Sequence, residues 1–157
     1  MNHKQATILP FIAVLACAGC AGGSSSPKIG DSHDIVVNGQ PVKATLLSVA
    51  DPLSGPGVRA DKGWRFVGIN VRFDNKGKKA IDFQPAARMK LMASWRPMSI
   101  GAVQGGPCAT DFAFGVQIKP GASDSGCVVF QAPADVKVTA LQMSTGEGNS
   151  KVSWDLK

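Results

Sequence analysis

The chain has 157 residues, with 17 Lys and Arg against 11 Asp and Glu and an apolar fraction of 44%. This length accommodates one globular domain with short extensions, which excludes a multidomain assembly. The charged fraction of 18% is too low for a chain that is disordered throughout, so we expect a packed core.

The N-terminal segment has the layout of a secretory signal peptide. Lys4 precedes an apolar stretch from Ile8 to Ala18 that is interrupted only by Pro10. A helix that spans a bilayer needs roughly 20 apolar residues, and this stretch is about half as long, so it does not predict a permanent transmembrane anchor. We therefore expect residues 1–19 to be removed and the mature protein to work outside the cytoplasm.

The end of this segment resembles a bacterial lipobox. It reads Leu15-Ala16-Cys17-Ala18-Gly19-Cys20 and continues into a Gly/Ser-rich stretch. Cys20 is the predicted lipidation site, Cys17 offers a competing frame, and an ordinary cleaved signal peptide is the alternative to both. About three acyl chains would anchor the protein durably to the cell membrane, although a secreted fraction is compatible with the sequence. Residues 20–30 then form a coil-like tether, and residues 31–157 form the domain.

The mature chain is mildly basic. Removal of Lys4 leaves 16 basic and 11 acidic side chains. No nucleic-acid-binding motif is present, so we expect no nucleic-acid partner, and the charge favours anionic envelope polymers or lipid headgroups. Lys76, Lys78 and Lys79 form the tightest basic cluster, which we interpret as a solvated hairpin tip.

Two cysteines, Cys108 and Cys127, remain for the mature domain in a compartment that permits oxidation. They predict a disulfide that closes a loop of about 19 residues and contributes on the order of 3 kcal/mol. Metal binding is the alternative, but a zinc or copper site would need more Cys or His ligands than this chain offers. We expect neither a metal nor a cofactor.

From residue 30 onward the apolar residues recur with period two, and turn residues separate them every ten or so positions. Asn38-Gly39 predicts a two-residue hairpin turn. Strands are predicted at residues 34–37, 42–49, 64–73, 80–83, 88–94, 112–118, 127–131, 136–143 and 151–156. Many short strands without helices indicate an all-β fold, an immunoglobulin-like antiparallel β-sandwich.

Alternation within strands predicts the core. In the strand from Trp64 to Phe73, the side chains of Val67, Ile69, Val71 and Phe73 share one face, which we expect to be buried. Trp154 shares a face with its apolar neighbours in the last strand and is interpreted as a core residue. The position of Trp64, at the mouth of its strand, is left open.

Three segments carry a family resemblance: Gly63 to Gly77, Lys119-Pro120-Gly121, and Gly126 to Pro133. They combine a long strand ending in an Asn-x-Gly turn with a Pro-Gly turn that feeds a Val-Phe strand ending at proline. About residues 30–157 thereby resemble extracytoplasmic immunoglobulin-like domains of a bacterial family of unknown function, which is similar in fold to the secreted mycobacterial immunoprotective antigens. The resemblance implies a fold and a compartment, and it carries over no catalytic residue.

Two long connections, residues 51–63 and 95–111, are the candidate functional regions, because structureless loops of this length are uncommon without a role. The second contains the candidate interaction residues Trp95, Met98, Ile100 and Val103. They could anchor a partner, or they could fold back over an open end of the sandwich.

Catalysis is not expected, because His33 is the single histidine of the mature chain and no triad or phosphate-binding loop accompanies it. The sequence therefore predicts a membrane-anchored, non-catalytic module that binds a protein or an envelope polymer. A structural envelope-maintenance lipoprotein without a specific ligand is the first alternative. The second alternative is an enzyme or metal carrier that uses His33 and carboxylates, or a carrier of a small ligand.

Overall fold

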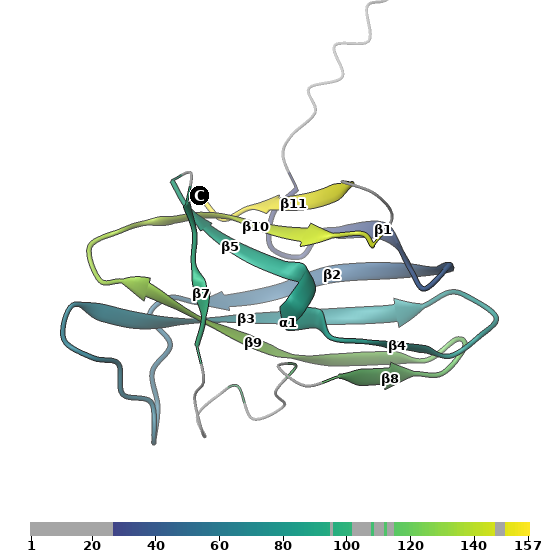
Figure 1. Ribbon diagram of the computed structural model, residues 1–157, viewed down its shortest axis with the longest axis horizontal. Helices are drawn as coiled ribbons and strands as arrows, with labels where there is room; N and C mark the ends of the chain where they lie inside the picture. Colours follow the sequence, from purple (N-terminus) through teal and green to yellow (C-terminus); the bar gives the residue numbers. More distant parts are fainter. Residues whose placement is uncertain (1–26, 95, 102–107, 109–111, 113–114, 147–149) are drawn as a thin grey trace, which may run out of the picture.

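The computed structural model describes residues 27–157 except 95, 102–107, 109–111, 113–114 and 147–149. The chain forms an immunoglobulin-like antiparallel β-sandwich, as predicted (Figure 1). One sheet has the order β1-β2-β3-β9-β7, the facing sheet has the order β11-β10-β5-β6, and β4 pairs with β8 at one end.

The elements of the five-stranded sheet are β1 (Ser32–Val37), β2 (Gln40–Ala50), β3 (Trp64–Asn75), β9 (Ser123–Pro133) and β7 (Ser99–Ile100). The four-stranded sheet contains β11 (Lys151–Asp155), β10 (Val138–Ser144), β5 (Met89–Ala93) and β6 (Arg96–Pro97). The end pair consists of β4 (Ile81–Phe83) and β8 (Val116–Ile118), and a short helix α1 (Pro85–Arg88) precedes β5.

The first hairpin forms where the sequence predicts it. Asn38 and Gly39 both have positive φ, at 51° and 70°, and Val37 pairs with Gln40 across the turn. Positive φ at both central residues is the requirement of a type I′ turn, which matches the twist of the strands it joins.

The predicted alternation along β3 is confirmed. Val67, Ile69, Val71 and Phe73 are each at most 2% exposed and point into the space between the sheets. The ring of Phe73 packs edge-on against Phe83 with 5.0 Å between centroids. Alternation thus places every second residue of β3, Trp64 among them, on the outer face of the sheet.

Trp154 of β11 is buried in the core, at 1% exposure. Its Nε1 donates a hydrogen bond to the carbonyl of Asp31 at 3.0 Å, and its ring meets His33 of β1 edge-on at 4.7 Å. These contacts join β11 of one sheet to β1 of the other. The interpretation of Trp154 as a core residue is confirmed.

The predicted strand at 112–118 is shorter in the structure and begins at Val116. The side chain of Phe112 instead packs in the hydrophobic core. It is 1% exposed, its N–H donates to the carbonyl of Cys127 at 2.9 Å, and its ring lies where a Cβ on Gly126 would be. Phe112 therefore contributes to the core from outside the β8 ladder.

Within the predicted connection at 95–111, residues 96–101 contain two short strands, contrary to the prediction of a structureless loop. Arg96 and Pro97 pair with β5, and two residues further on Ser99 and Ile100 pair with β9 of the other sheet. This segment therefore crosses from one sheet to the other, as Figure 1 shows for β7. Backbone pairing at its two short strands accounts for its course.

Residues 27–30, which the sequence assigned to the tether, are bonded to the domain. The N–H of Asp155 donates to the carbonyl of Pro27 at 2.6 Å, and the N–H of Gly30 donates to that of Leu46 at 2.7 Å. The predicted lipidation site Cys20, its rival Cys17 and the rest of residues 1–26 lie outside the described residues. In the part of the chain that the structure describes, no helix has the length and apolar character needed to cross a bilayer.

The main core, which runs from Ile35 to Trp154, and the disulfide both lie within residues 27–157. This segment therefore contains a complete folding unit, because both sheets and the apolar layer between them come from it.

Candidate functional site

A groove of about 190 Å³ lies at the end of the sandwich where β3 begins and β9 ends. We call it the Trp64 groove. Its lining residues are Trp64, Arg96, Pro97, Met98, Ser99, Gln131 and Pro133.

The strands β3, β9, β7 and β6 position these lining residues. Trp64 and Pro133 face each other across the β3–β9 ladder, and Ser99 faces Gln131 across the β7–β9 ladder. The β6–β7 crossover forms the remaining wall, where the N–H of Met98 donates to the carbonyl of Leu91 at 2.8 Å. The groove is therefore built on strand pairing, which gives it a fixed backbone frame.

Trp64 is the most distinctive side chain of the groove, because it is 45% exposed. A half-exposed indole offers a large apolar surface together with one N–H donor. Gln131, Ser99 and Arg96 add polar groups around it. An apolar platform with a few polar groups is typical of a surface that binds a ligand or a partner.

The four predicted interaction residues have different outcomes. Met98 lines the groove and is half-buried against the core. Ile100 is 48% exposed on β7, next to the groove but not part of its lining. Trp95 and Val103 lie outside the described residues.

Sequence reasoning missed Trp64 as a member of this site. Its position along β3 carried a signal, since Trp64 is out of phase with the buried residues Val67 and Ile69 and so belongs to the outer face. A tryptophan on the outer face of a strand is a candidate binding residue, because tryptophan is enriched among the anchors of interfaces.

Arg65 holds the backbone beside the groove. Its guanidinium donates to both carboxylate oxygens of Asp51, with Nε 2.5 Å from Oδ1 and Nη2 3.0 Å from Oδ2. It also donates to the carbonyl of Pro133, through Nη1, and to that of Val136, through Nη2 at 2.8 Å. The side-chain hydrogen bond to Asp51 raises the pKa of Arg65, although burial opposes it. The charged Arg65 thus ties the 51–63 connection to the end of β9.

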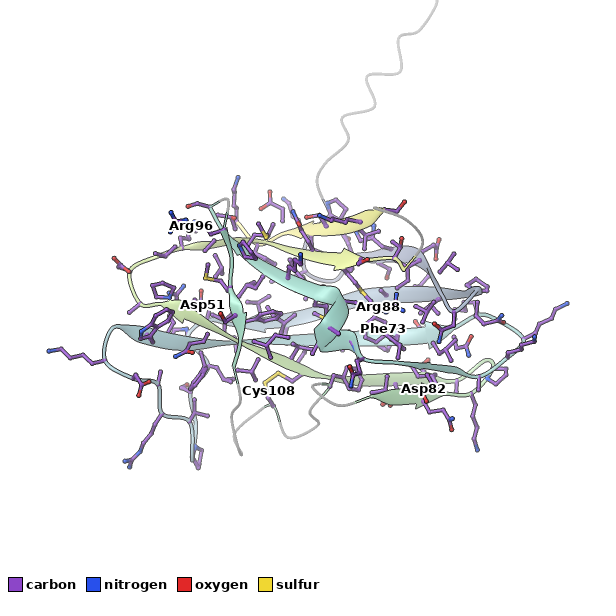
Figure 2. All side chains as sticks on the ribbon, viewed as in Figure 1. Asp51, Phe73, Asp82, Arg88, Arg96 and Cys108 are labelled. Atoms are coloured by element: carbon purple, nitrogen blue, oxygen red, sulfur yellow. A yellow bond between two sulfur atoms is a disulfide. The ribbon has the colours of Figure 1, made fainter. Side chains whose placement is uncertain are left out.

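A second apolar cluster covers the outer face of the five-stranded sheet. Leu53 from the 51–63 connection packs with Cys108, Cys127 and Val129. The predicted disulfide between Cys108 and Cys127 is present, and Figure 2 shows it beside β9. Gly68 lies beneath it: a Cβ there would be 2.9 Å from the sulfur of Cys108, so the sheet leaves room for the bridge. Through Leu53, the 51–63 connection therefore covers part of the outer face of the five-stranded sheet.

His33 makes structural contacts. Its Nε2 is 3.0 Å from the carbonyl oxygen of Ser153, and its ring lies against Trp154. Among the residues that the structure describes, no group of three or more His, Cys, Asp or Glu side chains could hold a metal ion. The absence of enzymatic activity stays a prediction.

The fold places the chain among antiparallel β-sandwich domains. More specifically, it belongs to the DUF4352 family, a domain of unknown function whose family model matches residues 30–152. No curated protein matches the chain.

Solved structures share its fold at low sequence identity. The yjhA protein of Bacillus subtilis has a TM-score of 0.61 and 13% identity, over 83% of this chain and 99% of that chain. The ycdA protein of Bacillus subtilis, a predicted lipoprotein, has a TM-score of 0.59 and 16% identity, over 83% of this chain. This chain spans 38% of the ycdA chain.

Proposed function

We propose that this protein is a lipid-anchored, extracytoplasmic binding module that contacts a protein or an envelope polymer through the Trp64 groove and performs no chemistry of its own. The lipobox-like sequence ending at Cys20 supports the location. The structural similarity to ycdA, a predicted lipoprotein, is consistent with it. The single lipidated cysteine would leave the whole domain free to face the envelope.

The exposure of Trp64 at the rim of a preformed groove is the observation that carries this proposal. Trp64 is 45% exposed, and tryptophan is among the residue types enriched at the energetic centres of interfaces. The strand-paired frame of the groove keeps the anchor in place before binding, which lowers the entropic cost of association.

Crosslinking in intact cells tests the proposal. The full chain would carry a photo-reactive amino acid at Ser99, on the wall of the groove, and recovered adducts would be identified by mass spectrometry. Trp64→Ala is the test variant. Leu47→Ala is the matched control, because Leu47 is a comparably exposed apolar residue, at 41%, on β2. A specific adduct that Trp64→Ala removes and Leu47→Ala retains supports the proposal, whereas equal yields from both variants refute it.

The alternative of a structural envelope-maintenance lipoprotein predicts no specific adduct at Ser99 in any variant. A small-ligand or metal carrier predicts binding that depends on His33, and the bonds of His33 to Ser153 and Trp154 favour a packing role instead. We also retain as a proposal the similarity in fold to the secreted mycobacterial immunoprotective antigens, which leaves the groove hypothesis unchanged.

A further inference from the structure

The end of the sandwich opposite the Trp64 groove carries four exposed lysines on two adjacent turns. Lys76, Lys78 and Lys79 lie in the connection from β3 to β4, and Lys119 lies in the connection from β8 to β9. We call these four residues the basic end. Figure 2 shows side chains tipped with nitrogen projecting outward from this part of the molecule.

The buried side chain of Asn75 joins the two turns. Its Nδ2 donates to the carbonyl of Lys79 at 2.8 Å and to that of Ile118 at 3.0 Å. Its backbone bonds to Gly121 and Ala122 of the second turn, each at 2.9 Å. The two lysine-bearing turns are therefore one hydrogen-bonded unit.

The first turn is held rigidly as well. The N–H groups of Lys78 and Lys79 both donate to Oε1 of Gln40, at 3.0 and 3.1 Å, and the N–H of Lys76 donates to a carbonyl of β2. A Cβ at Gly77 would lie 2.5 Å from the same Oε1, so glycine is needed for this close approach. These bonds fix the backbone of the exposed turn from which the ammonium groups project.

The charge of the basic end is not cancelled by its neighbours. Asp74 is buried, and its carboxylate already has partners: it accepts a hydrogen bond from Ser123 and pairs with Arg72 at 3.4 Å. In the described parts of the bordering strands β4 and β9, the exposed carboxylates are those of Asp82 and Asp124. Four lysines against two carboxylates leave a net positive surface.

We infer that the basic end binds anionic phospholipid headgroups of the membrane that carries the protein. The inference rests on the proposed lipid anchoring and is independent of the Trp64 groove. Each lysine near an anionic bilayer contributes about a fivefold gain in partitioning. Four such gains multiply to roughly 600-fold, so we expect the detached domain to bind anionic vesicles at low salt, and the proposed tether would raise the local concentration of the lysines at the bilayer further.

Cys20 lies seven residues before Pro27, which corresponds to an extended span of at most about 25 Å, so a lipid on Cys20 would keep the domain close to the bilayer. With the basic end on the bilayer, the Trp64 groove at the opposite end faces away from it, toward a partner.

Vesicle sedimentation with residues 27–157, the complete folding unit, tests this inference. The probes are vesicles of phosphatidylcholine alone and of equal parts phosphatidylcholine and phosphatidylglycerol, at low salt, with soluble polyphosphate in a separate arm. The test variant is Lys78→Gln/Lys79→Gln, which keeps the backbone bonds to Gln40. The control variant is Lys90→Gln/Lys151→Gln, which removes the same charge from exposed positions on the four-stranded sheet. Thermal melting verifies that each variant is folded.

We expect the domain to bind the vesicles that contain phosphatidylglycerol and not those of phosphatidylcholine alone. The partition coefficient should fall roughly 25-fold in the test variant, because each lost lysine contributes a factor of about five, and by less than about threefold in the control variant. An equal loss in both variants would overturn the inference, because net charge and not the basic end would then be responsible. Absence of vesicle binding would overturn it too. Binding to polyphosphate without vesicle binding would reassign the basic end to an anionic polymer.

Discussion

The Arg65 clamp should be among the most stabilising polar features of the domain. Arg65→Ala removes four hydrogen bonds and leaves the carboxylate of Asp51 without its partner. The side chains of the pair are only 15% and 23% exposed, so solvent compensates little for the loss. Hydrogen bonds to charged groups contribute about 1.5–3 kcal/mol, and fully buried pairs lose about 3–5 kcal/mol when one partner is removed. For this partly exposed clamp we expect a fall of about 3 kcal/mol in the free energy of unfolding.

Urea denaturation at neutral pH measures this loss, provided that the m-value stays unchanged. Arg72→Ala is the matched control, because Arg72 is 47% exposed and only 3.4 Å from its carboxylate partner, so we expect its cost to stay below about 0.5 kcal/mol. A double-mutant cycle with Asp51→Asn should give a coupling of at least about 1 kcal/mol. An Arg65→Ala variant no less stable than Arg72→Ala would refute the reasoning.

Three further predictions concern the same domain. Replacing Cys108 and Cys127 together by alanine should cost about 3 kcal/mol, because the bridge closes a loop with a sequence separation of 19; a loss below about 1 kcal/mol in chemical denaturation would contradict this. Gly126→Ala should destabilise by about 1–3 kcal/mol, since the new Cβ would lie 2.5 Å from the ring of Phe112, and an unchanged melting temperature would speak against that packing. Burial alone would raise the pKa of Asp74, but its hydrogen bond from a serine and its basic neighbours hold the pKa below the usual value. Its ionised form thus stabilises the fold at neutral pH, and this stabilisation should fade as the pH falls below about 4, a slope that Asp74→Asn should reduce in urea titrations.

The fold was accessible from sequence wherever the signal is local. Alternation identified the buried face of β3, Asn38-Gly39 identified the first hairpin, and the cysteine count identified the disulfide. Each of these depends on neighbouring residues or on a simple count of cysteines.

The groove could not be predicted because tertiary pairing creates it. β6 and β7 have two residues each, too short for any periodicity, and yet they determine the course of residues 96–101. The groove joins Trp64, Met98 and Gln131, which are distant in sequence. Because the sequence predicts a loop for this segment, the candidate interaction residues all come from it, and Trp64 on β3 is not among them.

The account depends most directly on the lipid at Cys20. Mass spectrometry of protein extracted from membranes and digested with trypsin would measure it, because cleavage after Lys28 releases the N-terminal peptide of the mature chain. We predict a peptide from Cys20 to Lys28 that carries a diacylglyceryl group on its cysteine. A peptide with an unmodified Cys20, or one that begins at another residue, would contradict this anchoring.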